Sequence, residues 1–119
     1  KIYRFFQQYK KDFDLPKQLS GLKTGWLAYP VIIKKQSRIK RRDMQIFLEK
    51  KGIQTRTIFT GNILRQPIMK KKKYKKIKNC SVNSNNIMKN GILIGCHQGL
   101  REAEISYMFK NIKLFLSKY

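Results

Sequence analysis

Hydrophobic and polar positions alternate with a period of two in the segment 53–59, where β-favouring residues occupy every second place: Ile53, Thr55, Thr57 and Phe59. This period predicts a strand of about seven residues. The strand leads to Gly61-Asn62, a pair that tolerates a positive φ angle and favours a sharp corner. Pro67 then suits the first position of a new helix. We take this strand, corner and exit as the centre of the chain.

Apolar residues recur at helical spacing in three other segments, which predict helices over 1–13, 39–51 and 101–118. Gly52 follows the second as a C-cap, and Glu102 and Glu104 suit the positive end of the third helix dipole. Two short runs, 25–33 and 91–96, predict strands, with Pro30 placing the first at a sheet edge or a bulge. Residues 12–24 and 81–86 predict a loop and a polar turn, and Ile87-Met88 predicts a short helical turn.

Together these elements predict an α+β fold, a small three-stranded sheet with helices packed on it. The strand at 25–34, the helix at 39–51 and the strand at 53–59 are expected to form a β-α-β unit. The chain of 119 residues is long enough for one domain, 1–119. It has neither a run of about 18 apolar residues nor a signal-peptide pattern, so we expect a soluble cytoplasmic chain, and its start at Lys1 suggests a fragment or a processed product.

The net charge of +22 makes nucleic acid an obvious candidate partner. The charge comes from 21 lysines and only 7 arginines, alongside 15 isoleucines and 7 asparagines. Recognition of bases and phosphates favours arginine, whereas an excess of Lys, Ile and Asn is what an A+T-rich coding sequence produces. We therefore give the charge little weight as a functional signal.

The densest charge run, Met69 to Lys78, has two interpretations. It is either a polyanion-binding patch for RNA, DNA or anionic lipid, or a solvated helix or loop with Tyr74 and Ile77 as its buried points. The first interpretation leads to an alternative function, a small lysine-rich nucleic-acid-binding protein. The chain has no RNP-type aromatic motif, no zinc spacing and no clear helix-turn-helix in its support.

Residues that carry catalysis or bind metal are few. Cys80 and Cys96 have no CxxC spacing, and with the single His97 they do not complete a zinc site, so buried thiols are expected. Six acidic residues and one histidine offer no convincing acid-base pair or nucleophile triad. We expect no catalytic residue and no metal in this chain. The Gly61-Asn62 corner with Arg65 is either the edge of a site or a plain tight turn beside an ordinary surface cation.

In order, the elements resemble the C-terminal small domain of the DegT/DnrJ/EryC1/StrS family of pyridoxal-phosphate-dependent sugar aminotransferases, and within it the NDP-4-keto-6-deoxyhexose 3-dehydratase branch. Four motifs carry the resemblance: Gly52-Ile53-Gln54-Thr55-Arg56, Phe59-Thr60-Gly61-Asn62, Arg65-Gln66-Pro67 and Gly95-Cys96-His97-Gln98-Gly99-Leu100. The chain departs from the branch at Thr57, at His97-Gln98 and at Arg101, where a helix-capping hydroxyl is usual.

The resemblance implies a nucleotide-sugar 3-dehydratase or aminotransferase of surface polysaccharide synthesis. Such an enzyme uses pyridoxal phosphate or pyridoxamine phosphate, bound by a large domain that is absent here, and acts as a homodimer on a nucleotide-linked deoxysugar. The isolated chain is then expected to be inactive, and a separately encoded large domain is one possible partner. His97 falls in the wrong domain and motif to be the catalytic histidine of the branch.

The resemblance also suggests which residues enclose the substrate. We expect Asn62, with Gly61 at the corner, to hydrogen-bond the sugar or cofactor side. We expect Arg65 or Arg56 to pair with the nucleotide diphosphate, since a guanidinium fork suits phosphate.

Overall fold

The computed structural model describes residues 1–75 and 81–119. Its strands form one four-stranded sheet in the order β1-β2-β4-β3, with bounds β1 Phe13–Asp14, β2 Ala28–Ile33, β3 Thr55–Thr57 and β4 Gly91–Gly95. The helices are α1 Ile2–Gln7, α2 Arg41–Lys50, α3 Val82–Asn90 and α4 Glu102–Leu116, with two 3-10 turns, η1 Ile63–Arg65 and η2 Pro67–Lys71. The predicted α+β class is confirmed, with one strand more than the three expected.

Every neighbouring pair of strands in the sheet is antiparallel. Because β2 and β3 both pair with β4, they run parallel to each other with β4 between them. The predicted β-α-β unit is therefore present in a split form. The additional strand, β1, has only two residues, too few to show any periodicity within the segment that we expected to be a loop. The order places β2 between β1 and β4, so the edge position predicted from Pro30 was wrong for the strand as a whole. β1 pairs with Ile32 and Ile33 alone, however, and leaves the side of β2 at Pro30 unpaired, where a residue without an N–H is tolerated.

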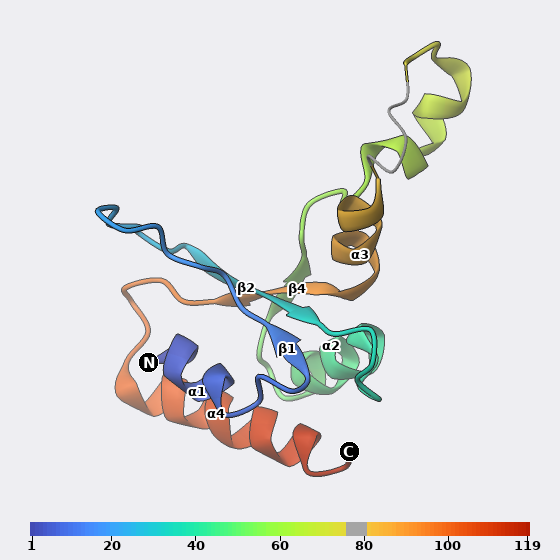
Figure 1. Cartoon of the computed structure of the whole chain (residues 1–119). Coiled ribbons are helices and arrows are strands. Elements are labelled where there is room, and N and C mark those ends of the chain that lie inside the picture. The colour runs from blue at the N-terminus through green and yellow to red at the C-terminus, as the bar shows by residue number, and fades with distance from the viewer. Residues whose placement is uncertain (76–80) are drawn as a thin grey trace.

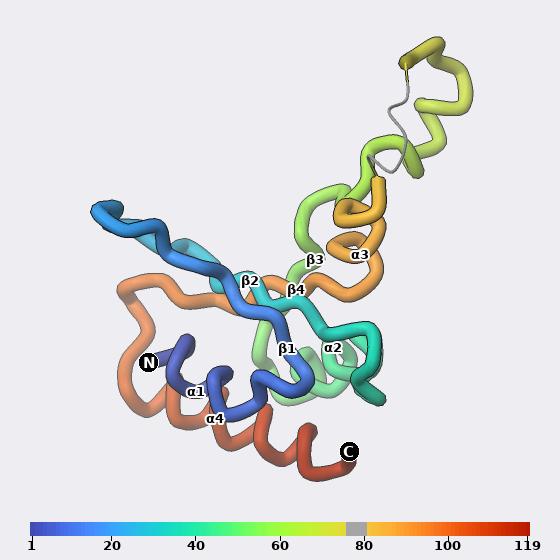
Figure 2. The backbone as a smooth tube through the Cα atoms, viewed as in Figure 1, coloured from blue at the N-terminus to red at the C-terminus, as the bar shows by residue number. Residues whose placement is uncertain are grey.

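Helices α1, α2 and α4 lie against one face of the sheet, as Figures 1 and 2 show. Alternate residues of the strands point to these helices, and the buried core comprises Ile2, Phe5, Phe6, Phe13, Tyr29, Val31, Ile33, Ile39, Met44, Leu48, Ile92, Ile94, Met108, Ile112 and Phe115. Phe6 is fully buried, with ring centroids 5.1 Å from Phe13 and 6.4 Å from Tyr29. Burial also raises the pKa of Tyr29 to about 12.

The end of α2 confirms the C-cap predicted at Gly52. Gly52 has φ +71°, its N–H donates to the carbonyl of Glu49 at 2.9 Å, and the N–H of Ile53 donates to that of Leu48 at 2.9 Å. This pair of bonds defines a Schellman motif, which satisfies the last carbonyls of the helix. The carboxylate of Glu49 then accepts bonds from the backbone N–H and the hydroxyl of Thr55, at 2.6 and 2.9 Å. These contacts fix where β3 starts.

Three predicted elements have different bounds. The strand expected over 53–59 is confined to Thr55–Thr57, because Phe59 adopts φ +44° and takes the chain out of the sheet. The first helix ends at Gln7, where the chain continues in turns. The polar turn expected at 81–86 was wrong: those residues open α3, a helix of nine residues. Asparagine and serine favour turns locally, and here tertiary contacts outweigh that preference.

Residues 58–75 and α3 extend from the end of the sheet, away from the three packed helices, in Figures 1 and 2. We call these residues the arm, and the sheet with α1, α2 and α4 the body. Among the residues that the structure describes, no helix is long and apolar enough to cross a membrane.

Candidate functional site

The corner after β3 presses against α3. Gly61 adopts φ +66°, which favours glycine, and a Cβ atom built on it would lie 2.3 Å from the Cβ of Met88. Any larger residue at position 61 would therefore strain the backbone and also push α3 away. Phe59, two residues earlier, has a positive φ angle and an 87% exposed side chain. Positive φ angles at two of the three residues 59–61 mark a shaped corner, and such an angle at a non-glycine residue is typical of functional sites.

Asn62 holds this corner in place and is only 3% exposed. Its Oδ1 accepts a bond from the backbone N–H of Leu64 at 3.0 Å, which caps η1, and its Nδ2 donates to Oδ1 of Asn85 at 2.8 Å. The same Asn85 oxygen accepts a bond from Nε of Arg65 at 3.2 Å. We call Asn62, Arg65 and Asn85 the asparagine junction. It joins the corner to α3 by polar contacts.

Three of the four residues expected to enclose substrate lie at this corner: Gly61, Asn62 and Arg65. Gly61-Asn62 is a tight turn, and the side chain of Asn62 is hydrogen-bonded to Asn85 on α3. Arg65 stays exposed, and one guanidinium N–H is used on Asn85. Asn85 is the residue that sequence reasoning missed. It lies in the segment predicted as a turn, where no periodic apolar signal indicated a helix face.

Arg56 lies elsewhere. It is on the outer face of β3, opposite Leu93 of β4, and borders a hollow of about 590 Å³. That hollow is mainly apolar and is lined by Leu27, Ala28, Gly52, Ile53, Gln54, Arg56, Leu93, Gly95, His97, Leu100, Ala103, Glu104, Tyr107 and Met108. None of the junction residues borders it. The structure thus separates Arg56 from the other three predicted residues.

The residues that depart from the 3-dehydratase branch have local structural roles. Nδ1 of His97 accepts a bond from the N–H of Gly99 at 3.1 Å, which shapes the turn before α4. At the N-cap of α4, the carboxylate of Glu104 accepts bonds from the backbone N–H of Arg101 at 2.6 Å and from its guanidinium at 2.7 Å. These bonds hold the pKa of Glu104 below its ordinary value. The bond from the backbone of Arg101 to Glu104 is one of the two bonds of a capping box. The guanidinium of Arg101 adds an ion pair to the same carboxylate.

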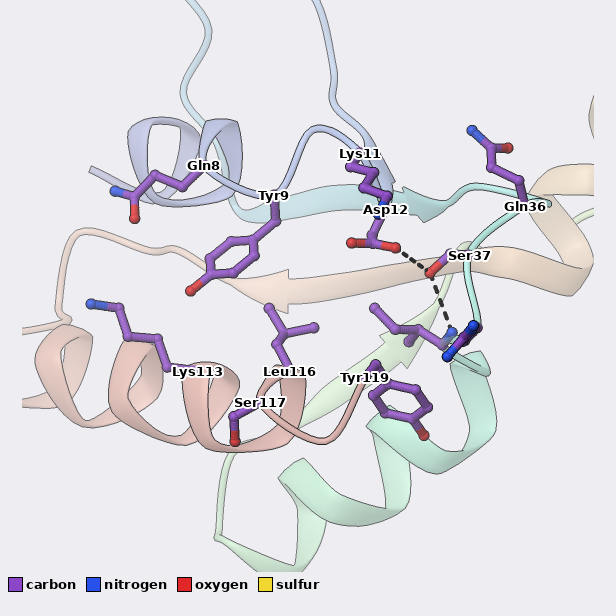
Figure 3. Close-up of a pocket in the computed structure, with 12 residues that line it drawn as sticks. Gln8, Tyr9, Lys11, Asp12, Gln36, Ser37, Lys113, Leu116, Ser117 and Tyr119 are labelled. Carbon is purple, nitrogen blue, oxygen red and sulfur yellow. Dashed lines mark hydrogen bonds between the residues drawn. The ribbon is translucent and has the colours of Figure 1, made fainter.

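A second hollow, of about 690 Å³, lies where the segment after α1 meets the C-terminal end of α4 (Figure 3). It is bordered by Tyr9 and Asp12 from the N-terminal segment, by Ser37 from the loop between β2 and α2, and by Leu116 and Tyr119 from the C-terminal end. The dashed lines in Figure 3 join Ser37 to Asp12, at 2.7 Å, and to the N–H of Ile39, at 3.2 Å. These bonds fix the loop that leads into α2.

Among the described residues, Cys96 and the lysine run give no reactive group. The thiol of Cys96 is half-buried and donates to the carbonyl of Trp26 at 3.4 Å, and burial raises its pKa. Cys80 lies outside the described residues, as do Ile77 and the last lysines of the run. Tyr74 is 46% exposed, so the expectation that it is buried was wrong. No group of three or more His, Cys, Asp or Glu side chains forms a metal site within the described ranges.

The described residues do not fit pyridoxal phosphate. That cofactor needs a carboxylate or arginine facing its ring nitrogen and a base at its reactive carbon. Asp12 bonds Ser37 and Asp14 pairs with Lys34 at 3.6 Å. Glu104 and His97 border one hollow, but the carboxylate is bound to Arg101 and Nδ1 of His97 closes its own turn.

Comparison with known proteins gives consistent results. A model of the DegT/DnrJ/EryC1/StrS aminotransferase family matches residues 2–113. The chain is 28% identical over 102 residues to lipopolysaccharide biosynthesis protein RfbH of Salmonella typhimurium, covering 86% of this chain and 23% of that protein. It is 30% identical over 109 residues to GDP-4-keto-6-deoxy-D-mannose 3-dehydratase of Escherichia coli O55:H7, covering 92% and 28%.

A solved structure of the Escherichia coli GDP-4-keto-6-deoxy-D-mannose-3-dehydratase with bound hydrated PLP superposes with a TM-score of 0.75. The sequences are 28% identical, and the match covers 92% of this chain and 28% of that one. The chain therefore spans only about a quarter of the length of the relatives it matches.

Proposed function

Because the chain belongs to the DegT/DnrJ/EryC1/StrS aminotransferase family, we propose that it serves as the substrate-enclosing small domain of a nucleotide-sugar enzyme. The enzyme is a 3-dehydratase or aminotransferase that makes a deoxysugar for surface polysaccharide. Two relatives support this class by name, a lipopolysaccharide biosynthesis protein and a GDP-sugar 3-dehydratase. The chain works in the cytoplasm, and these 119 residues catalyse nothing by themselves, since the cofactor is held by a large domain that they do not include.

The asparagine junction is the observation that carries the proposal. Asn62 is buried and engages Leu64 and Asn85, so its amide shapes the corner and fixes Asn85. Asn85 in turn holds Nε of Arg65 and leaves the other guanidinium N–H groups of this exposed side chain for a ligand. A guanidinium held in one orientation pairs with the diphosphate of a nucleotide sugar at a smaller entropic cost. Arg56 is a second candidate for the diphosphate, on a separate hollow.

The outer face of the sheet is consistent with contact to a large domain. Its side chains alternate with the core residues and remain half-buried and mostly apolar: Ala28, Pro30, Ile32 and Leu93. In the described ranges, no helix of this chain packs over them as α1, α2 and α4 pack on the other face. We propose that this face lies against the cofactor-binding domain, in one polypeptide or supplied by a separate chain, and that the complete enzyme is a homodimer.

A chimera tests the proposal. Residues 1–119 replace the matching segment of the Escherichia coli GDP-sugar 3-dehydratase, and turnover of the GDP-sugar is measured. We expect an active chimera in which Arg65→Ala lowers kcat/KM by about 10- to 100-fold, the scale of one charge-assisted hydrogen bond. Asn62→Ala should also lower it, through loss of the corner.

Arg4→Ala is the matched control, because Arg4 is an exposed arginine on α1, far along the chain from the junction. An active chimera with unchanged kcat/KM in both Arg65→Ala and Asn62→Ala would reject the assigned roles. An inactive but folded and dimeric chimera would count against the small-domain role itself.

A further inference from the structure

A charged groove borders the asparagine junction at Asn85. The groove has a volume of about 740 Å³ and lies between the loop from β2 to α2, the first turn of α2, and α3. Its lining residues are Lys34, Lys35, Ser37, Ile39, Lys40, Arg41, Arg42, Val82, Asn85, Asn86, Lys89 and Asn90. Six of these twelve are Lys or Arg, and none is Asp or Glu. We call it the cationic groove.

The charge in the groove exceeds what the high net charge alone explains. The other two hollows described above each include a carboxylate, Asp12 in one and Glu104 in the other. In the described part of the chain, Lys34 is the one groove cation with a carboxylate partner, Asp14 at 3.6 Å. Like charges gathered in one hollow repel each other, so the groove favours an anionic occupant.

Arg41 is oriented before any ligand binds. Its Nε donates to the carbonyl of Lys89 at 3.0 Å, and its Nη1 donates to Oε1 of Gln45 at 2.8 Å. Both acceptors are uncharged, so the guanidinium keeps its full charge while its position is fixed. Fixed cations bind phosphate groups with a smaller loss of side-chain entropy than free ones.

The start of α2 adds to the same field. The helix begins with Lys40-Arg41-Arg42, no side chain caps its first N–H groups, and the one acidic residue of its first turn, Asp43, does not line the groove. Cations at the positive end of a helix dipole are unfavourable, whereas an anion there is stabilised. An anion in the groove would offset both the uncapped N–H groups and the clustered cations.

The loop that carries Lys34, Lys35 and Lys40 is also held in shape. Ser37 bonds Asp12 and Ile39 (dashed lines in Figure 3), and the N–H of Lys34 donates to the carbonyl of Asp12 at 2.8 Å. On the other wall, Nδ2 of Asn90 donates to Oδ1 of Asn86 at 2.8 Å, which leaves the amide N–H groups of Asn86 to face a ligand. Hydrogen bonds within the protein therefore hold both walls.

We infer that the cationic groove binds the diphosphate group of a nucleotide. Its volume is in the range of small-molecule sites, and its donors are cations and amides, as two adjacent phosphates require. Asn85 borders the groove and accepts the bond from Arg65, so the groove and the asparagine junction share one wall. The choice of a nucleotide rests on the proposed function, whereas affinity for a diphosphate rests on the groove itself.

The test is titration of the purified 119-residue chain with inorganic pyrophosphate and with GDP, in about 150 mM salt so that exposed charges are screened. The groove variant is Lys40→Gln with Arg42→Gln. The control is Lys50→Gln with Lys51→Gln, which removes the same charge at the other end of the same helix, outside the groove. We expect the groove variant to bind both ligands at least 10-fold more weakly, and the control to change affinity by less than twofold.

Thermal unfolding in ligand-free buffer is a second measurement. The groove variant should unfold at the same or a higher temperature than the parent chain, because it loses repulsion at the positive end of α2. The control should unfold at the same or a lower temperature. Far-UV circular dichroism checks that both variants fold. If the double groove variant does not fold, Arg42→Gln alone, at an exposed side chain, replaces it.

Equal weakening in both variants would show that binding follows net charge and would overturn the inference, as would an absence of saturable binding to pyrophosphate. GDP bound no more tightly than pyrophosphate would overturn the assignment to a nucleotide. The nucleotide assignment would also be overturned, in favour of nucleic acid, if a single-stranded oligonucleotide displaced GDP at a lower concentration counted per phosphate group. An inactive chimera would leave all these results unchanged, so the two proposals fail separately.

Discussion

The body and the arm of this chain are held together by different forces. In the body, fifteen hydrophobic side chains are buried in one cluster between the sheet and three helices. In the described arm, the one buried side chain is polar, Asn62, while large apolar residues are exposed, including Phe59, Ile63 and Ile68. Burial of apolar area gives the body its stability, and directional hydrogen bonds give the arm its shape.

This difference indicates where a partner or ligand binds. The arm exposes apolar side chains and holds Phe59 at a positive φ angle. Both features lower the stability of the folded chain, and both are typical of segments that contact a partner or ligand. Both proposed ligand contacts, Arg65 and the α3 wall of the cationic groove, lie on the arm or border it. The body serves as the rigid support.

The largest expected effect distinguishes Phe6 in the body from Phe59 in the arm. Phe6→Ala removes a fully buried ring and should lower the free energy of unfolding by about 3–5 kcal/mol, while Phe59→Ala, at an 87% exposed ring, should change it by less than about 0.5 kcal/mol. Urea denaturation measures both. If Phe6→Ala does not fold, Phe6→Leu should still fold and cost about 1 kcal/mol. Similar losses at both positions would contradict the division into body and arm.

Gly61 tests the contact between the corner and α3. Gly61→Ala should cost about 1–3 kcal/mol, because a Cβ there meets Met88 at 2.3 Å and the φ angle of +66° disfavours alanine. Gly25→Ala is the control, since that glycine has no positive φ angle and no heavy atom within 4 Å of an added Cβ. Hydrogen exchange should show faster exchange in α3 of the first variant only. Equal costs at the two glycines would mean that the corner does not press on α3.

The smallest effect concerns Glu49, an exposed polar clamp between α2 and the start of β3. Bonds from the backbone and hydroxyl of Thr55 lower the pKa of Glu49 below its ordinary value. Its stabilising contribution is therefore present above the unfolded-state pKa, about 4.3, and is lost as the pH falls through the lower folded-state pKa. Glu49→Gln should remove this acid-dependent loss, measured as thermal unfolding from pH 3 to 7.

A double-mutant cycle with Thr55→Val checks the cause of that pH effect. The coupling between the two positions should be present at pH 7 and should shrink at pH 3, when the carboxylate is protonated. A coupling that does not change with pH would show that the clamp is not electrostatic.

The elements of the body were largely predictable. α2 and α4 have apolar residues at helical period, β4 is a short apolar run, and Gly52 marks where α2 ends, so local pattern and tertiary packing agree. The arm was less predictable. α3 consists mainly of residues that favour turns, and it becomes a helix because Asn85 meets Asn62 and because Gly61 packs on Met88. Such contacts link residues more than twenty positions apart and leave no periodic signal.

The candidate site divides in the same way. Gly61, Asn62 and Arg65 were identified from their motif, and the structure brings them together, whereas it places Arg56 on a different hollow. The cationic groove could not be predicted, because its second wall is α3: five of its six cations lie within 34–42, and Lys89 joins them only when α3 packs beside α2. In a chain with 28 Lys and Arg, no local pattern distinguishes those six from the rest.

The sequence by itself thus determined the α+β class, the family resemblance and the corner after β3, because period, glycine placement and motif spacing are local properties of the chain. Only the tertiary structure decided that the corner is fastened to α3, that Arg56 stands apart, and that a groove of cations lies between α2 and α3. These depend on which segments fold against one another, and that choice is made by burial and by hydrogen bonds between residues distant in sequence.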